Sequence, residues 1–383
     1  MVEIFVCGDI LNDTSKNTEI FDCALSNIIK GADYSICNFE APIKLNANPI
    51  QKVGPVKSQS KEIIPELQKS GFNLFLLANN HIFDYGKTGL EATINEAKKY
   101  GIIPIGAGLS LTDAYRPSIH TIGGLTFGFI NAAEAQFGVL KEGDSNSGYA
   151  WINSPRINEM IIKLREEVDY LIFFAHAGLE HYDIPMIEWK ERYKEFCDLG
   201  VDIVIGSHPH VVQGYEYYND SIIFYSLGNF YFPKSLSDIT YGYSVSLKFN
   251  IGKAPSFDLI YHKLNNGELC LVESEITNID ISDLNNKIID SEYRKIIPDV
   301  YKSAFNKICF PYFASVHNAI LPSDGVRQKI IKIIKQLIPK SNNSNNKLLL
   351  LMHLMNNETY YYITLRYLTE YWYNHELSGP EQL

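Results

Sequence analysis

The sequence predicts an α/β fold in which a sheet is covered by helices on both faces. Through the first two thirds of the 383-residue chain, short apolar runs alternate with segments of helical spacing. The runs are apolar throughout, as in strands that are buried on both faces. Glycines follow several helical segments, as they do at helix ends. A length of 383 residues allows one large domain with an extension, or two or three smaller domains.

The predicted elements follow one another in a regular order. The first are strand 2–7, helix 18–30, strand 34–39, helix 61–70, strand 72–77 and helix 90–100. The alternation returns with helix 158–167, strand 170–174, helix 187–199 and strand 201–205. Further strands are predicted at 119–130, 222–225, 243–249 and 257–262. Because no helices separate these last four, they indicate antiparallel additions or a second sheet.

The character of the chain changes after about residue 278. Predicted helices cover 282–289, 326–338 and 347–372, and the polar stretch 341–346 reads as a loop or linker. We therefore expect two domains, residues 1–278 and a helical extension of residues 279–383. The tyrosine-rich last helix either packs on the body of the protein or forms a docking face for a protein partner.

Composition excludes some classes of protein. With 34 Lys and Arg against 44 Asp and Glu, the net charge of −10 argues against a nucleic-acid binder. The six cysteines include no CxxC pair, which argues against a zinc knuckle or a redox pair. Several lie inside apolar runs, which indicates buried thiols in a reducing compartment. Neither a leader nor an apolar stretch of membrane-spanning length is evident. We expect a cytoplasmic chain with no membrane segment.

Side chains that bind metals follow the predicted strands. They are Asp9, Glu40, Asn80, His176 and His208. The carboxyl ends of strands in a doubly covered sheet form the ligand crevice, so these side chains should converge. Strands that simply end in polar residues would explain one or two such positions, but not a set of acid, amide and imidazole with so little Lys or Arg.

The segment His208-Pro209-His210 strengthens this prediction. If it is extended, the two imidazoles point the same way and reach one centre. Mixed oxygen and nitrogen ligands without thiolate suit Mn, Zn or Fe, as one or two ions. Such a site activates water for attack on a phosphorus or carbonyl centre.

His81 follows the candidate ligand Asn80 and is placed to act as general acid toward a leaving group. Asp84, three residues later, is placed to hydrogen-bond the other ring nitrogen and fix the tautomer. The alternative is that Asn79-Asn80-His81 only caps a loop.

These residues lie in six blocks whose order and spacing match a known family over about residues 1–250. The blocks are Gly8-Asp9; Asn38-Phe39-Glu40; Ala78-Asn79-Asn80-His81 with Asp84 and Gly86; His176 with Gly178 and Glu180; Gly206-Ser207-His208-Pro209-His210-Val211-Val212-Gln213; and Ser226-Leu227-Gly228-Asn229-Phe230. Together they resemble the CapA family of capsule and poly-γ-glutamate synthesis proteins, whose fold is that of calcineurin-like metallophosphoesterases.

The resemblance implies a four-layer αββα sandwich with a metal cluster at its mouth. By position, the implied ligands are Asp9, Glu40, Asn80, His176, His208 and His210. His81 matches the catalytic acid, and we group Asp84 and Glu180 with it as candidate catalytic residues.

Three features depart from the pattern. The metallophosphoesterase motif begins Asp-x-His, but Leu11 stands at its third position, so one site loses an imidazole. A single ion, or a weak second one, is then expected. Ala177 replaces the usual aromatic residue after His176, and the N-terminal membrane anchor that many relatives carry is not evident in this sequence. The last hundred or so residues lie outside the resemblance.

Two functions follow from these observations. The first is a metal-dependent hydrolase of a phosphoester, or of a γ-glutamyl amide, in capsule or polyglutamate metabolism. The alternative is a non-catalytic metal-binding subunit of a synthesis or export complex, with the C-terminal helices as its docking face. The substrate in the first case is a phosphorylated or γ-glutamyl compound.

Overall fold

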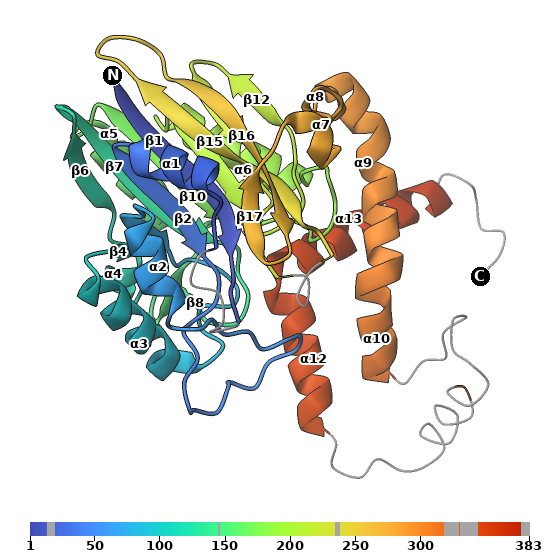
Figure 1. Ribbon diagram of the computed structural model, residues 1–383. Helices are drawn as coiled ribbons and strands as arrows, with labels where there is room; N and C mark the ends of the chain where they lie inside the picture. Colours follow the sequence, from blue (N-terminus) through green and yellow to red (C-terminus); the bar gives the residue numbers. More distant parts are fainter. Residues whose placement is uncertain (14–19, 145, 234–237, 318–328, 330–343, 377–383) are drawn as a thin grey trace. The chain divides into compact units, whose positions relative to one another are not determined.

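The computed structural model describes residues 1–13, 20–144, 146–233, 238–317, 329 and 344–376 (Figure 1). The chain divides into two compact units. The first consists of Met1–Ile50 and Val56–Ile289, and the second of Gln51–Pro55 and Asp290–Leu383. Residues 279–289 thus belong to the first unit in the structure. The functional division into residues 1–278 and 279–383 stays a prediction.

The larger sheet of the first unit has eight strands among the described residues, in the order β17-β16-β15-β1-β2-β3-β4 with β14 beside β1. They are β1 (Val2–Ile10), β2 (Tyr34–Phe39), β3 (Leu74–Leu76), β4 (Ile103–Ile105), β14 (Asn229–Tyr231), β15 (Tyr241–Phe249), β16 (Ser256–Asn265) and β17 (Glu268–Leu271). Strands β1 to β4 are parallel, whereas β15, β16 and β17 add on in antiparallel pairs. The prediction of antiparallel additions is confirmed.

A second sheet has the order β12-β13-β11-β10-β7-β6. Its strands are β6 (Ser118–Ile122), β7 (Leu125–Ala133), β10 (Tyr170–His176), β11 (Ile203–Ser207), β12 (Tyr215–Tyr218) and β13 (Ser221–Phe224). The four central strands are parallel and the two edges antiparallel. A small third sheet contains β5 (Ala107–Gly108), β8 (Val139–Leu140) and β9 (Gly148–Ala150).

The single strand predicted over residues 119–130 is wrong, because the chain turns back on itself within it. Gly123 and Gly124 join β6 to β7, with φ of 56° and 85°. Positive φ at both central residues of a two-residue turn is the geometry that glycine favours in hairpins. An apolar run interrupted by two glycines therefore indicates two strands.

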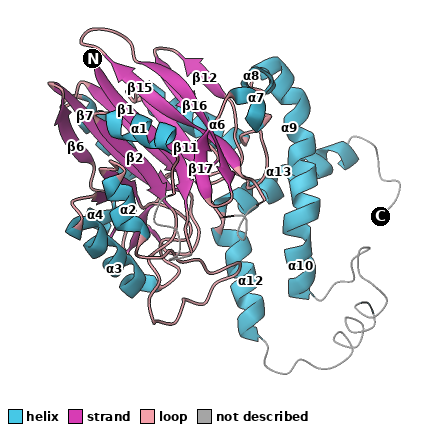
Figure 2. Ribbon diagram, in the orientation of Figure 1, coloured by secondary structure: helices cyan, strands magenta, loops and turns pink. Residues whose placement is uncertain are grey.

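The first unit has four layers (Figures 1 and 2). Helices α1 (Cys23–Gly31), α2 (Ile63–Lys69) and α3 (Gly86–Lys99) cover the outer face of the larger sheet. Helices α5 (Pro155–Arg165) and α6 (Ile187–Asp198) pack on β10 and β11 of the second sheet. Between the two sheets lies a second buried cluster. The predicted αββα sandwich is confirmed.

Alternation along β1 explains how one strand serves two cores. Phe5 and Cys7 point to the cluster under the helices, whereas Ile4 and Val6 point to the cluster between the sheets. Every one of these side chains is buried, which is why the strand reads as a continuous apolar run.

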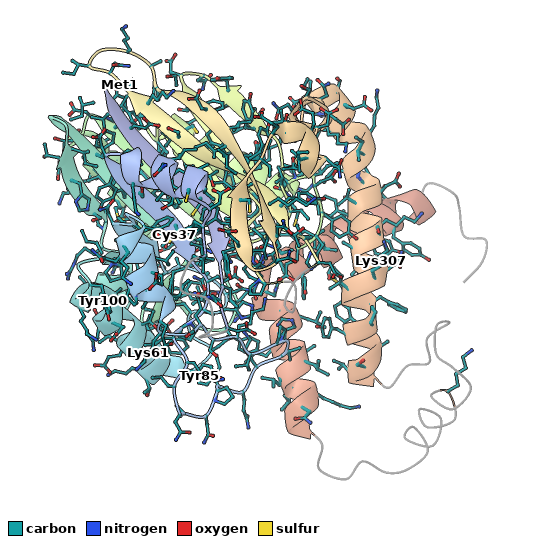
Figure 3. All side chains as sticks on the ribbon, in the orientation of Figure 1. Met1, Cys37, Lys61, Tyr85, Tyr100 and Lys307 are labelled. Carbon is teal, nitrogen blue, oxygen red and sulfur yellow. The ribbon has the colours of Figure 1, made fainter. Side chains whose placement is uncertain are left out.

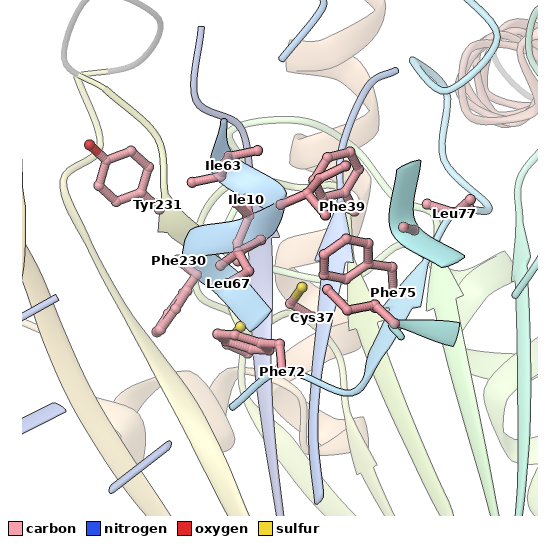
Figure 4. Close-up of a cluster of buried hydrophobic side chains, with 14 of the residues drawn as sticks. Ile10, Cys37, Phe39, Ile63, Leu67, Phe72, Phe75, Leu77, Phe230 and Tyr231 are labelled. Carbon is pink, nitrogen blue, oxygen red and sulfur yellow. The ribbon is translucent and has the colours of Figure 1, made fainter. Parts of the chain in front are cut away.

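The core under the helices is rich in aromatic rings (Figure 4). Phe39 of β2 stacks on Phe75 of β3 with ring centroids 4.6 Å apart, and Cys37 and Phe72 lie close by. Stacked and edge-on aromatic pairs add to the stabilisation that burial provides. Side chains fill the space between the ribbons throughout this region (Figure 3).

The helix predicted over residues 18–30 is α1, which starts later. Asp22 caps it by accepting a hydrogen bond from the Leu25 backbone N–H, and residues 14–19 lie outside the described residues. Short helices α4 (Leu111–Ala114), α7 (Ser274–Thr277) and α8 (Ile281–Lys287) complete the first unit. The last of these matches the helix predicted over residues 282–289.

The second unit is helical where it is described. It contains α9 (Asp290–Ala304), a π-helical turn (Phe305–Cys309), α10 (Phe310–His317), α12 (Ser344–Asn356) and α13 (Glu358–Glu376). The prediction of a single helix over residues 347–372 is wrong, since the helix is interrupted at Asn357. The buried Asn357 side chain accepts a hydrogen bond from the Tyr360 N–H at 2.9 Å and caps α13.

Two other C-terminal predictions fall largely outside the described residues. They are the helix 326–338, of which only residue 329 is described, and the first half of the linker 341–346. Residues 344–346 of that linker begin α12. Among the described residues, no helix combines the length and apolar character that a membrane span needs.

The buried His262 of β16 should make the stability of the fold depend on pH. Its imidazole is fully buried beside the Phe230 ring. Burial lowers its pKa to about 3, and the Tyr243 backbone offsets only part of this effect. The unfolded chain therefore binds a proton below pH 6.5 that the folded chain takes up only near pH 3. His262 should make unfolding about 2 kcal/mol easier at pH 5 than at neutral pH.

The change His262→Leu should remove this part of the acid sensitivity, because leucine has no proton to bind. The measurement is the free energy of unfolding in urea at pH 7 and pH 5, for both proteins. An equal loss between the two pH values in wild type and variant would contradict the prediction.

Candidate metal centre

Five of the six predicted ligands lie at the carboxyl ends of parallel strands from both sheets. Asp9 lies near the end of β1, Glu40 directly after β2, Asn80 beyond β3, His176 at the end of β10 and His208 directly after β11. The His208 backbone N–H donates to Asp9 Oδ2 at 3.3 Å, across 199 residues of sequence. All six predicted ligands, His210 included, are buried. The structure brings them to one place, as the sequence predicts.

Glycines let the strand ends approach so closely. A Cβ atom on Gly8 would lie 2.0 Å from the Gly228 carbonyl oxygen, and one on Gly206 would lie 2.0 Å from the Tyr225 carbonyl oxygen. Any other residue would push the neighbouring backbone away. These glycines set the positions of Asp9 and His208, which follow them within two residues.

Asp9, Glu40 and His210 form the tightest group. One potential ligand atom of each lies within 4.8 Å of the others. His210 Nδ1 is 3.3 Å from Asp9 Oδ2, and His210 Nε2 is 3.7 Å from Glu40 Oε1. Within the described chain, neither carboxylate oxygen of the buried Glu40 has a hydrogen-bond partner. Such atoms are rare in folded proteins, and a bound cation would satisfy them.

The electrostatics of this group reflect burial and mutual charge. Burial raises the pKa of Glu40 to about 7, although the His210 imidazolium lowers it in part. Burial alone would lower the pKa of His210, but the carboxylates of Glu40 and Asp9 raise it to about 9. The buried acids therefore attract positive charge, which a histidine proton supplies here.

A second group joins the two sheets through His176. Its Nε2 is 3.2 Å from Asn80 Oδ1, and its Nδ1 is 3.3 Å from Asn38 Nδ2. The Asn38 amide also donates to Asp9 Oδ1 at 2.7 Å, which links the two groups. Burial, with the neighbouring histidines, holds the pKa of His176 well below its usual value. A neutral imidazole beside an amide oxygen is a donor pair that a divalent cation accepts.

The histidines of the fifth block adopt an unexpected backbone. His208 and His210 have φ of 96° and 61°, in the left-handed region, so His208-Pro209-His210 is not extended. The expectation that alternation in an extended segment aligns the imidazoles is therefore wrong. The rings still lie together, with centroids 6.1 Å apart. Strained backbone of this kind gathers at functional sites.

His81 is oriented by a neighbouring carboxylate, as predicted. Its Nδ1 lies 2.7 Å from Asp84 Oδ2, and both side chains are buried. The Lys57 backbone N–H also donates to Asp84 Oδ2, at 2.8 Å, which holds the carboxylate in place. His81 Nε2 faces the first group, 4.0 Å from Glu40 Oε1. A proton on Nε2 would therefore point at the centre of the site.

Glu180 reaches the site from the loop after β10. Its Oε1 is 3.9 Å from His208 Nε2, and 42% of its side chain is exposed. Burial of the carboxylate would raise its pKa, but His208, His210, His81 and His181 together lower it to about 2. It is an ionised carboxylate at the rim of the site.

Leu11 fills the place where the metallophosphoesterase motif carries histidine. It forms a separate buried apolar cluster with Ala41 and Phe232. The Phe232 ring lies 5.0 Å from the His210 ring and carries the Lys57 ammonium at 4.9 Å on its surface. One wall of the first group is thus apolar, where an imidazole would supply another ligand.

Two contact residues were not among the predicted ligands or catalytic residues, although Asn229 stands in the sixth block. Asn229 accepts from His210 Nδ1 at 2.9 Å. Glu134, directly after β7, lies with Oε1 3.6 Å from His208 Nε2 and is buried. Both obey the rule that revealed the others once the observed strands are known, since Glu134 directly follows β7 and Asn229 begins β14.

Two sheets with helices outside, and polar side chains at the joint edge of the parallel strands, define a metallophosphoesterase-like sandwich. A model of the family described as bacterial capsule synthesis protein PGA_cap matches residues 3–234. The chain belongs to this family, and the resemblance to CapA proteins is confirmed.

Two curated relatives carry the CapA name. The PGA biosynthesis protein CapA of Bacillus subtilis is 32% identical over 212 residues, which is 54% of this chain and 55% of the relative. The capsule biosynthesis protein CapA of Bacillus anthracis is 31% identical over 220 residues, 55% of this chain and 53% of the relative. The chain spans about half the length of the curated relatives it matches.

Among solved structures, the chain is similar to a putative 5′-nucleotidase from Staphylococcus aureus, in complex with α-ketoglutarate. The sequence identity is 16% and the TM-score 0.44, over 76% of this chain and 58% of the other.

Proposed function

We propose that the chain is a metal-dependent hydrolase acting on a phosphoester, or on a γ-glutamyl amide, in capsule or polyglutamate metabolism. The observation that carries the proposal is the convergence of buried carboxylates, amides and imidazoles from both sheets on one edge. Glu40 is the strongest single sign, because its buried carboxylate lacks any hydrogen-bond partner in the described chain.

The donor set fits one or two divalent ions. Asp9, Glu40 and His210 would hold one of them. Asn80, His176 and His208 would hold the other, and Nδ1 of His208 is buried without a hydrogen-bond partner among the described residues. Oxygen and nitrogen donors without thiolate favour Mn, Zn or Fe.

The chemistry divides between the ion and the side chains. A bound divalent cation lowers the pKa of water and stabilises charge on the attacked oxygen. The Asp84 carboxylate accepts a hydrogen bond from His81 Nδ1 and so fixes the orientation of the ring. When the ring is protonated on both nitrogens, Nε2 can donate its proton at the centre of the site. This proton would go to the leaving-group oxygen or nitrogen.

Replacing a ligand should remove metal and activity together. We expect Asp9→Ala and His208→Ala to bind less metal per chain than wild type and to lose turnover of p-nitrophenyl phosphate. Elemental analysis of protein purified without added metal gives the first result, and the release of nitrophenol gives the second. Activity that survives exhaustive chelation, or intact turnover in His208→Ala, would overturn the proposal.

Leu11→His should strengthen the site that lacks an imidazole. The new ring would replace the apolar contact with Ala41 and Phe232 and add a nitrogen ligand beside Asp9. We expect the affinity for the more weakly held ion to rise at least about tenfold, within the range by which ligand-shell changes alter metal binding. The measurement is a titration of metal-free protein with Mn²⁺ or Zn²⁺, and Leu11→Met serves as a control. An unchanged stoichiometry and affinity would contradict this expectation.

The second candidate is a non-catalytic metal-binding subunit of a capsule or polyglutamate synthesis or export complex. Leu11 favours this candidate because it removes an imidazole ligand from the site. Helix α13 also favours it, since Leu365, Leu368 and Trp372 are at least half exposed and could form a docking face. A metal-loaded protein inert toward both phosphoester and γ-glutamyl substrates, yet co-purifying with a polymer ligase or transporter, would support it. Unchanged assembly after deletion of residues 347–383 would remove α13 as the docking face.

A further inference from the structure

The two ring nitrogens of His208 have different surroundings. Nδ1 is buried and has no hydrogen-bond partner in the described part of the chain. Nε2 faces two carboxylates, with Glu134 Oε1 at 3.6 Å and Glu180 Oε1 at 3.9 Å. A neutral imidazole carries one proton, so the nitrogen that faces acceptors is the one expected to bear it.

Glu134 is held far more firmly than Glu180. Gln136 Nε2 donates to Glu134 Oε1 at 2.8 Å, and the Gly178 backbone N–H donates to Oε2 at 3.1 Å. The Glu134 backbone N–H also donates to the His176 carbonyl oxygen at 3.0 Å. Glu134 is 1% exposed, whereas the Glu180 side chain is 42% exposed. The carboxylate of Glu134 therefore has a fixed position beside the His208 ring.

One contact points the other way. Gln136 Nε2 lies 3.5 Å from His208 Nε2, and an amide N–H in that direction would favour a proton on Nδ1. The Gln136 amide nitrogen also donates to Glu134 Oε1, over the shorter distance of 2.8 Å. The Glu134 and Glu180 oxygens lie slightly farther from Nε2, at 3.6 and 3.9 Å, than the amide does. At comparable distances a carboxylate attracts an N–H group more strongly than a neutral group does, because charge-assisted contacts are about twice as strong as neutral ones.

We propose that Glu134 is a positioning residue, whose carboxylate keeps the His208 proton on Nε2 and so leaves the Nδ1 lone pair free to bind a metal ion. The inference rests on the proposed function, since it gives His208 the role of ligand. Metal-binding histidines generally donate their other ring N–H to a carboxylate or carbonyl, and loss of that partner weakens metal binding 10- to 100-fold.

A direct ligand role for Glu134 fits the geometry less well. Both its carboxylate oxygens already accept hydrogen bonds, one from Gln136 in the loop after β7 and one from Gly178 in the loop after β10. Among the described residues, Glu134 also lies outside the group whose ligand atoms gather within 4.8 Å, namely Asp9, Glu40 and His210. Its contact to the site runs through the far side of the His208 ring.

The decisive experiment compares wild type with Glu134→Gln, which keeps the shape but removes the charge. Metal-free protein is titrated with Zn²⁺ against a chelating dye. We expect Kd to rise 10- to 100-fold in Glu134→Gln. The matched control Glu191→Gln, on the exposed face of α6, should keep the wild-type Kd. A Kd for Glu134→Gln within about twofold of wild type would overturn the proposal.

A second measurement reports the proton itself and needs neither metal nor turnover. In ¹⁵N-histidine NMR of metal-free wild type, the His208 signals are those that His208→Gln removes. We expect His208 to be the Nε2–H tautomer in wild type, and a mixture of tautomers in Glu134→Gln. An Nδ1–H tautomer in wild type would overturn the proposal even if Glu134→Gln failed to fold.

The proposal for Glu134 and the proposed hydrolase function can fail independently of each other. A wild-type protein that binds Zn²⁺ tightly, shows the Nε2–H tautomer and hydrolyses nothing would defeat the hydrolase and leave the role of Glu134 intact. A protein that hydrolyses substrate but binds metal equally well with and without the Glu134 carboxylate would support the hydrolase and contradict the role of Glu134.

Discussion

Replacing His81 with alanine should lower turnover by about 100- to 10,000-fold and leave the bound metal in place. The Nε2 atom of His81 faces the site, and Asp84 fixes the ring through Nδ1 at 2.7 Å. Proton transfer to a leaving group is the step that this imidazole serves. The measurement pairs kcat for p-nitrophenyl phosphate with elemental analysis of the same sample.

Asp84→Asn tests the same proton transfer through the residue that orients His81. The neutral amide of asparagine cannot stabilise a positively charged His81 ring as the Asp84 carboxylate does, so kcat should fall while KM changes little. The effect should be smaller than that of His81→Ala, because the imidazole is still present. A loss of metal in His81→Ala equal to the loss in His208→Ala would contradict the separation of proton donor from ligand.

Much of the fold was predictable because a strand that is buried on both faces appears in the sequence as a continuous apolar run. Strand β1 carries side chains into two cores, so it reads as one apolar run. The same logic predicted Asp9 and Glu40, because each follows such a run and parallel strands end at one edge. Their closeness in space follows from the topology alone.

Other parts depend on contacts that sequence spacing does not contain. The direction of the His208 and His210 rings rests on positive φ angles, which no motif specifies for histidine. Glu134 is the clearest omission, since it follows β7 in the same way that Glu40 follows β2. The predicted strand stopped at residue 130, three residues short of the observed end at Ala133, so Glu134 did not stand out as a residue that follows a strand.

The C-terminal helices show a different limit. The break at Asn357 is made by one capping side chain inside a segment that is otherwise strongly helical. Asparagine within a helical pattern is ambiguous, because it is tolerated in a helix and favoured at its start. Only the observed hydrogen bond to the Tyr360 N–H decides between the two.

Glu40→Gln should abolish tight metal binding and yet give a metal-free protein at least as stable as wild type. Glu40 is fully buried, and in the described chain neither of its carboxylate oxygens accepts a hydrogen bond. An ionised acid in that position costs free energy that a neutral amide of the same shape largely avoids. The nearby His210 imidazolium offsets part of this cost in wild type, so we expect the metal-free variant to match wild type or to gain at most about 1–3 kcal/mol at pH 8.

The order should reverse when metal is added. A ligand that binds only the folded state stabilises it by RT ln(1 + [L]/Kd), about 4 kcal/mol at a thousand times Kd. Wild type should therefore gain stability with Mn²⁺ or Zn²⁺, and Glu40→Gln should gain little. Unfolding in urea with and without metal measures both effects, with Glu191→Gln as the surface control. A metal-free variant much less stable than wild type would mean that the Glu40 carboxylate serves the fold, and the cation site would then have to lie elsewhere.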